Sequence, residues 1–153
     1  MALSEIEEAL VRHDGINAKS ADFMLAHGRH FIPAPRPQGM RRGRIGNCYS
    51  AAGKLVLSQA DDAAVTYRYV EGVAMIPAIG ELMPHAWVSP EGTSAAIDIT
   101  WAQNPRLGTA VYFGVEFTKS ALAAVIRERG YWGLLDPIDD VLLDAWGRPC
   151  DGC

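Results

Sequence analysis

The sequence of 153 residues is poor in cysteine, and it has no long apolar run. Three cysteines, an odd number, do not form a disulfide framework and favour a reducing compartment such as the cytoplasm. No apolar stretch approaches the ~18 residues of a membrane span, and the acidic start 1–8 is unlike a signal peptide. Gly-rich nucleotide-binding motifs are also absent. We therefore expect neither a membrane protein, nor a disulfide-rich secreted domain, nor a P-loop or dinucleotide-binding protein.

The residues that are present suit one globular domain over 1–153, which is long enough to bury a core. Hydrophobic residues make up 49% of the chain and charged residues 21%, which are ordinary values for such a domain. The net charge of −4 gives no general attraction to nucleic acids or to membrane surfaces. We therefore expect neither as a partner.

Helical patterns occupy the two ends of the chain, and strand patterns occupy most of the middle. Ser4 and Glu7 have the spacing of a capping box, which predicts a helix ending near Gly15. The other predicted helices cover 20–27, 48–59, 119–129 and 136–146. The predicted strands cover 64–76 (as one strand or as two that meet at 71–72), 84–89, 95–101 and 110–117. This order predicts an α+β fold in which N-terminal helices (1–30) and C-terminal helices (119–146) flank a core at 45–120.

The segment between two of these strands, Pro90-Glu91-Gly92-Thr93, predicts a tight hairpin. If Glu91 and Gly92 form a two-residue loop, His85 faces Asp98 directly across the two strands. Directly opposed side chains have Cβ atoms about 4.5–5.5 Å apart on one face of the sheet. The imidazole and the carboxylate are therefore expected to meet, either as part of an active site or as a solvated ion pair.

Cys48 follows Asn47, a favoured N-cap residue, so the thiol is expected in the first turn of a helix. The helix dipole and the free N–H groups there favour an anion, and cysteines at helix starts have lowered thiol pKa values. The Cys48 backbone N–H is also a candidate oxyanion-hole donor. A small buried apolar side chain is the alternative interpretation of a free cysteine.

Together, these elements resemble the transglutaminase-like branch of the papain-like superfamily. The matching residues are Gly46, Cys48, Tyr49 and Ala52; His85, Ala86 and Trp87; and Ile97, Asp98 and Thr100. The resemblance covers about residues 45 to 120 and implies a papain/transglutaminase-like core, with the nucleophile helix packed on a small antiparallel sheet. Reactions in that superfamily include proteolysis, amide hydrolysis, acyl transfer and deamidation, and some members have lost activity.

The resemblance implies a catalytic triad with Cys48 as nucleophile, His85 as general base and then acid, and Asp98 as the residue that orients the imidazole. Papain-like enzymes often use a Gln upstream of the nucleophile to bind the oxyanion. Gln38 is placed loosely for that role, and Asn47 is its rival if it does not cap the helix. Tyr49, Trp87 and Trp101 are candidates for the wall of a substrate cleft, although a tryptophan in the core is an equally ordinary role.

Two further charged features remain open. Four arginines (Arg36, Arg41, Arg42 and Arg44) lie within nine positions of the Pro- and Arg-rich segment 31–44, which we expect to be a loop. They either hold a carboxylate or phosphate of the substrate or form a solvated basic loop. Glu71 interrupts an apolar strand, and it binds a substrate amine, pairs with an arginine or is an edge-strand charge.

The remaining candidate ligands give no cofactor site. Cys150 and Cys153 cannot complete a four-ligand zinc site by themselves, and no thioredoxin-like pattern surrounds them. His13, His27 and His30 show no spacing typical of metal ligands, so we read them as surface or packing residues. We therefore expect no metal and no cofactor.

Three functions are compatible with the sequence. The first is a cysteine hydrolase that cleaves a peptide, isopeptide or amide bond of a peptide or protein substrate through a Cys48 thioester. The second is acyl transfer to an amine instead of water. The third is a binding module that keeps the fold without chemistry. Reactivity of Cys48 separates the third from the others, and the preferred acceptor separates the first two.

Overall fold

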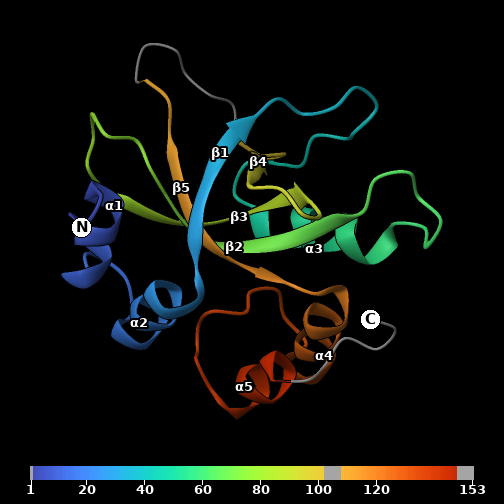
Figure 1. The fold of residues 1–153 in the computed structure, drawn as a ribbon. Helices are drawn as coiled ribbons and strands as arrows, with labels where there is room; N and C mark the ends of the chain where they lie inside the picture. The colour runs from blue at the N-terminus through green and yellow to red at the C-terminus, as the bar shows by residue number, and fades with distance from the viewer. Residues whose placement is uncertain (1, 102–107, 148–153) are drawn as a thin grey trace.

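The computed structural model describes residues 2–101 and 108–147, in which five helices surround a five-stranded closed barrel (Figure 1). The strands are β1 (Arg29–Ala34), β2 (Tyr67–Met75), β3 (Leu82–Pro90), β4 (Ala95–Ile97) and β5 (Val111–Phe117). The helices are α1 (Glu5–Val11), α2 (Ala18–His27), α3 (Cys48–Ser58), α4 (Lys119–Arg129) and α5 (Asp140–Trp146). The predicted α+β class is confirmed. The expected small antiparallel sheet is instead a barrel of order β1-β4-β3-β2-β5 with one parallel pair, β1 with β4.

Local sequence signals set most helix ends. The capping box of Ser4 and Glu7 opens α1, and Thr118 caps α4, which ends at Gly130 in the left-handed conformation (φ 77°). α4 covers the predicted residues. α1 ends at Val11, earlier than predicted, and α5 starts after its cap Asp139, later than predicted.

β1 is the strand that the sequence did not predict. The proline-rich pattern of 31–44 predicts a loop, and for the residues up to Ala34 this prediction is wrong. β1 pairs with β4 on one side and with β5 on the other, so it closes the barrel. These pairings join segments more than 60 residues apart in the sequence, such as Ile32 with Ala95, and no local pattern signals them.

Alternation along the strands divides the side chains between two cores. The smaller core contains only residues from the strands and their ends, and we place it inside the barrel, since no helix contributes to it. Its largest member is Trp87, which is fully buried against Phe31 and Tyr112. Gly114 leaves the space for this ring, because a Cβ there would lie 2.9 Å from Trp87 Cη2.

The larger core lies between the outer face of the barrel and the helices. α3 packs on β2 and β3, while α1 and α2 pack on β5 and α4 packs on β2. In Figure 1, α1 and α2 lie on one side of the barrel, and α4 and α5 lie together on another. α3 is therefore the helix that lies against the strand carrying His85.

Glu71 anchors the segment between α4 and α5. Its carboxylate is fully buried and accepts hydrogen bonds from the hydroxyl of Tyr69 and from the backbone N–H groups of Leu134 and Leu135. Burial raises the pKa of Glu71, and these hydrogen bonds oppose that rise. Glu71 lies on β2 between two neighbouring strands, so the expectation of an edge-strand charge is wrong.

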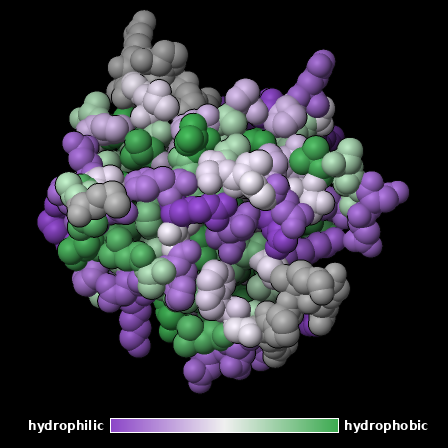
Figure 2. All heavy atoms as spheres, viewed as in Figure 1, coloured by the Kyte–Doolittle hydropathy of each residue, from purple (hydrophilic) through white to green (hydrophobic). Residues whose placement is uncertain are grey.

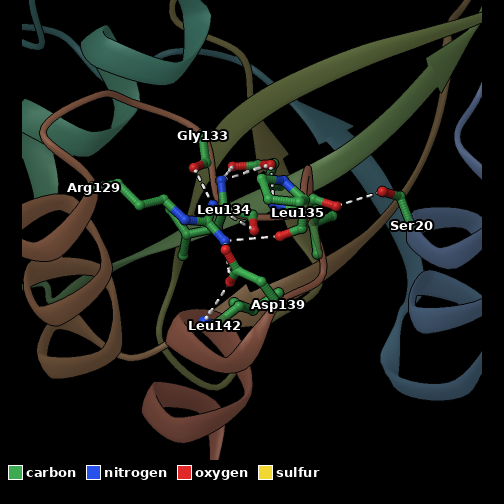
Figure 3. Close-up of polar contacts among 9 residues, drawn as sticks. Ser20, Arg129, Gly133, Leu134, Leu135, Asp139 and Leu142 are labelled. Atoms are coloured by element: carbon green, nitrogen blue, oxygen red, sulfur yellow. Dashed lines mark hydrogen bonds and ion pairs between the residues drawn. The ribbon is translucent and has the colours of Figure 1, made fainter.

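Arg129 holds the same segment from its other side (Figure 3). Its guanidinium donates to the carbonyl oxygens of Gly133 and Leu134 at 3.0 and 3.1 Å and pairs with Asp139 at 2.8 Å. Ser20 of α2 donates to the carbonyl of Leu135, also visible in Figure 3. The segment 133–139 is thus fixed to the barrel and to two helices by backbone hydrogen bonds.

None of the helices in residues 2–101 and 108–147 has the length and apolarity to cross a membrane. Hydrophobic residues on the face in Figure 2 occur in separate patches between hydrophilic ones. The most exposed large hydrophobic side chains, Ile45 and Ile32, belong to different segments. Single exposed side chains of this kind are normal for a protein surface.

Candidate functional site

The centre of the candidate site is the contact between His85 on β3 and Asp98, the residue directly after β4. The Nε2 atom of His85 lies 2.6 Å from Oδ2 of Asp98. Both side chains are largely buried, with 11% and 6% of their surfaces exposed. A charge-assisted hydrogen bond in such a position is shielded from water and is correspondingly strong. The predicted meeting of imidazole and carboxylate is confirmed.

The predicted register of the hairpin is wrong. Val88 is paired with Ile97, so the loop has four residues and the two strands are shifted by two positions from the predicted pairing. Continued by one residue, this register places Asp98 opposite Trp87 and diagonal to His85. Because the shift is even, both side chains stay on the face that sequence alternation assigns to them. Diagonal neighbours remain within reach of long side chains.

Asp98 is saturated with hydrogen bonds. Its Oδ2 accepts from the hydroxyl of Tyr112 at 2.9 Å in addition to the contact with His85. Its Oδ1 accepts from the backbone N–H groups of Thr100 and Trp101 at 3.2 and 3.0 Å. Burial would raise the pKa of Asp98, but the hydrogen bond and charge of His85 and the other donors lower it. Asp98 therefore stays ionised and holds a fixed orientation.

Cys48 is the first residue of α3, and Asn47 occupies the N-cap position, as predicted. The thiol is 9% exposed and forms no disulfide. This thiol is one of the groups that raise the pKa of His85. Since Nε2 of His85 faces Asp98, Nδ1 is the ring nitrogen left for the thiol. The packing of α3 on β3 brings these two distant parts of the sequence together.

The imidazole of His85 is held in its charged form. Burial is the largest influence and would lower the pKa of His85, but interactions with Asp98 and Cys48 together outweigh it and raise the pKa to about 9. At neutral pH the ring therefore carries two N–H groups. The Nε2–H group faces the carboxylate of Asp98, and the Nδ1–H group is the one left for the thiol.

The other predicted site residues have different positions. Asn47 is exposed, and its side chain makes no capping hydrogen bond, which leaves its amide free to act as a donor. Gln38 lies on the separate groove along α3 and not beside the cysteine. Trp87 is fully buried inside the barrel, so the prediction that it lines a cleft is wrong. Tyr49 is half-buried, and burial, followed by the charge of Glu71, raises the pKa of its hydroxyl.

Sequence reasoning missed Tyr112 as a member of the site. It lies on β5, 14 residues after Asp98, and a tyrosine in an apolar strand carries no signal of this role. Trp101, considered before only as a cleft wall, has its ring centre 5.2 Å from that of His85. Tyr112 lies 6.3 Å from the same ring. These aromatic rings limit the movement of the imidazole.

Comparisons of the chain with models of protein families, with curated proteins and with solved structures found no match. Within residues 2–101 and 108–147, no three His, Cys, Asp or Glu side chains are grouped to hold a metal ion. Cys150 and Cys153 lie outside the described residues. The chemical interpretation therefore rests on the arrangement of Cys48, His85 and Asp98.

Proposed function

We propose that the protein is a cysteine hydrolase that cleaves a peptide, isopeptide or amide bond through a thioester on Cys48. The observation that carries the proposal is the buried contact of the His85 imidazole with Asp98, together with the pKa of about 9 to which Asp98 and Cys48 raise that ring. An imidazolium beside a thiol stabilises the thiolate, which is the nucleophilic form. A nucleophile helix packed on the strand that carries the histidine also fits a transglutaminase-like core, and a thiol nucleophile fits the reducing cytoplasm.

In the first half of the reaction, the Cys48 thiolate attacks the carbonyl carbon, forming a C–S bond and moving an electron pair to the carbonyl oxygen. The backbone N–H of Cys48 and the free amide of Asn47 are the donors that stabilise this oxyanion. As the oxyanion collapses, the C–N bond breaks, and the His85 imidazolium gives its proton to the departing amine. The product is an acyl thioester on Cys48.

In the second half, the now neutral His85 takes a proton from water, and the resulting hydroxide attacks the thioester carbonyl. The C–S bond breaks, the carboxylic acid leaves, and the thiolate–imidazolium pair is restored. Asp98 stays ionised throughout and stabilises the imidazolium each time it forms.

Intact-mass analysis tests the proposal. The protein is incubated with peptide pools and with an activated acyl ester, and a Cys48 acyl adduct is expected in the wild type and not in Cys48→Ala. Release of free acid identifies water as the acceptor, while release of an amide in the presence of added amines indicates acyl transfer instead. Absence of an adduct with every donor would overturn the proposal in favour of a binding module.

A further inference from the structure

A cavity of about 360 Å³ lies at one end of the barrel, beside the candidate site. Its walls include Arg36 and Arg42 from the loop after β1, together with Asp98, Trp101 and Tyr112. β1 and β4 run in parallel, and both end here, so the loop that follows β1 lies over the residues that follow β4. This volume lies at the lower end of the range found for small-molecule sites.

The cavity and the candidate site share one wall. Tyr112 donates its hydroxyl to Asp98, and Trp101 lies against the ring of His85. A ligand group in the cavity would therefore lie next to Asp98, within the same group of residues that holds the imidazole of His85.

The two arginines have no charged partner within the part of the chain that the structure describes. Neither Arg36 nor Arg42 forms an ion pair there, although Asp98 lines the same cavity. The oxygens of Asp98 are already occupied by His85, Tyr112 and backbone donors. The guanidinium groups of Arg36 and Arg42 therefore do not pair with the carboxylate of Asp98.

The backbone holds both arginines at the cavity. Arg36 stands between two prolines, which fix the φ angle on each side and stiffen the segment. Arg42 precedes Gly43, whose N–H donates to the carbonyl of Ile99 at 2.8 Å. This hydrogen bond ties the loop to the residue next to Asp98. Both side chains are exposed, and two planar guanidinium forks at one cavity are well suited to a carboxylate or a phosphate.

We propose that this cavity binds an anionic group, a carboxylate or a phosphate, of the acyl donor through Arg36 and Arg42; this rests on the proposed hydrolase function. The net charge of −4 gives no overall attraction to anions, so recognition has to be local. The substrate class is then acidic peptides or amides that carry a negative group near the scissile bond. Of the four arginines in the loop, only these two line the cavity.

Anion binding is tested first without any substrate. Inorganic phosphate and, separately, acetate are titrated into the whole protein while the indole N–H resonance of Trp101 is followed by NMR. We expect a saturable shift with at least one anion and a loss of roughly tenfold or more in affinity in Arg36→Gln/Arg42→Gln. The anion that binds with the higher affinity shows whether the cavity prefers a phosphate or a carboxylate.

The matched control is Arg41→Gln/Arg44→Gln, which removes the same charge from the same loop and leaves the cavity intact. This control should bind like the wild type. Equal weakening in both double variants, or no weakening in either, would overturn the anion site.

A second experiment connects the cavity to Cys48. Two peptide vinyl sulfones that differ only in a succinyl or an acetyl cap react with the thiol, and their rate ratio is measured by site-resolved mass spectrometry. We expect faster labelling by the succinyl probe in the wild type and in the Arg41/Arg44 control, with the preference lost in Arg36→Gln/Arg42→Gln. A ratio unchanged by that variant contradicts the proposal. Anion binding without labelling of Cys48 by either probe would instead show that the hydrolase function is wrong.

Discussion

The imidazole of His85 and the carboxylate of Asp98 meet at 2.6 Å although they are not directly paired across the sheet. Asp98 lies just after the last residue of β4, where its backbone is free to turn and its second oxygen can accept the N–H groups of Thr100 and Trp101. A residue at a strand end can thus bind a side chain on the next strand with one oxygen and backbone N–H groups of the following turn with the other. The backbone donors therefore hold the carboxylate in place in addition to the imidazole that it contacts.

Cys48 should react faster with thiol reagents than Cys150 and Cys153. Iodoacetamide at neutral pH is expected to label it in the native protein, because an imidazolium lies beside it. His85→Ala should slow this labelling roughly tenfold or more, and the exposed His13→Ala serves as the matched control without effect. Site-resolved mass spectrometry separates Cys48 from the terminal thiols. If Cys48 stays unlabelled while Cys150 or Cys153 is labelled, Cys48 is not the nucleophile.

Asp98→Asn should lower the pKa of His85 from about 9 towards its ordinary value of 6.5, because the carboxylate charge is lost. Turnover of any substrate should fall roughly 10²- to 10⁴-fold. Tyr112→Phe removes a hydrogen bond to the same oxygen but keeps the charge, so its effect should be much smaller. An NMR titration of the His85 ring measures both variants. An unchanged His85 pKa in Asp98→Asn would mean that the carboxylate has only a structural role.

The stability of the fold should decrease from mildly acidic to alkaline pH. The pKa of His85 is raised in the folded state, so its contribution is complete below the ordinary pKa of 6.5 and is lost as pH rises through about 9. The contribution is at most on the order of 3 kcal/mol. Urea unfolding at pH values below and above this window measures it. Asp98→Asn should make the free energy of unfolding depend less on pH. An equally steep decrease in that variant would show that the His85–Asp98 pair is not the cause.

Gly114→Ala should destabilise the barrel, since the new Cβ would lie 2.9 Å from Trp87 Cη2 and 2.9 Å from the carbonyl oxygen of Glu71. We expect a loss of about 1–3 kcal/mol in the free energy of unfolding. Gly147→Ala is the control, because its nearest neighbour would be at 3.5 Å. Adding Trp87→Phe removes the clashing ring atoms and should recover part of the loss in a double-mutant cycle. Strictly additive effects would mean that Trp87 is not the obstacle.

Glu71→Gln should cost about 1–3 kcal/mol of stability, because an amide nitrogen would face one of the buried backbone N–H groups of Leu134 and Leu135. Glu91→Gln provides the same chemical change in an exposed ion pair with Arg68 and should cost less than about 1 kcal/mol. Denaturant unfolding measures both. Hydrogen exchange at Leu134 and Leu135 should also accelerate in Glu71→Gln only, and protected amides there would contradict the anchoring role.

Local sequence signals predicted several parts of the structure correctly. The capping box placed the start of α1, the helical pattern and Gly130 placed α4, and alternation placed His85 and Asp98 on one face of the sheet. α3 also starts at Cys48, directly after Asn47 as predicted, although the Asn47 side chain makes no capping hydrogen bond. These features depend on interactions between residues that are close in the sequence, such as cap hydrogen bonds and the alternating direction of strand side chains. The local sequence is therefore enough to predict them.

The tertiary structure decided the rest. β1 forms because its backbone groups pair with those of β4 and β5. Glu71 can be buried in the core because the backbone N–H groups of Leu134 and Leu135, distant in the sequence, donate hydrogen bonds to its carboxylate. The same closure brought Tyr112 to Asp98 and placed two of the four loop arginines at one cavity. By itself the sequence determined which groups can react and which face each strand side chain takes. Only packing between distant segments decided which of those groups meet. Such contacts depend on how the barrel closes, and the spacing of residues within one segment does not indicate them.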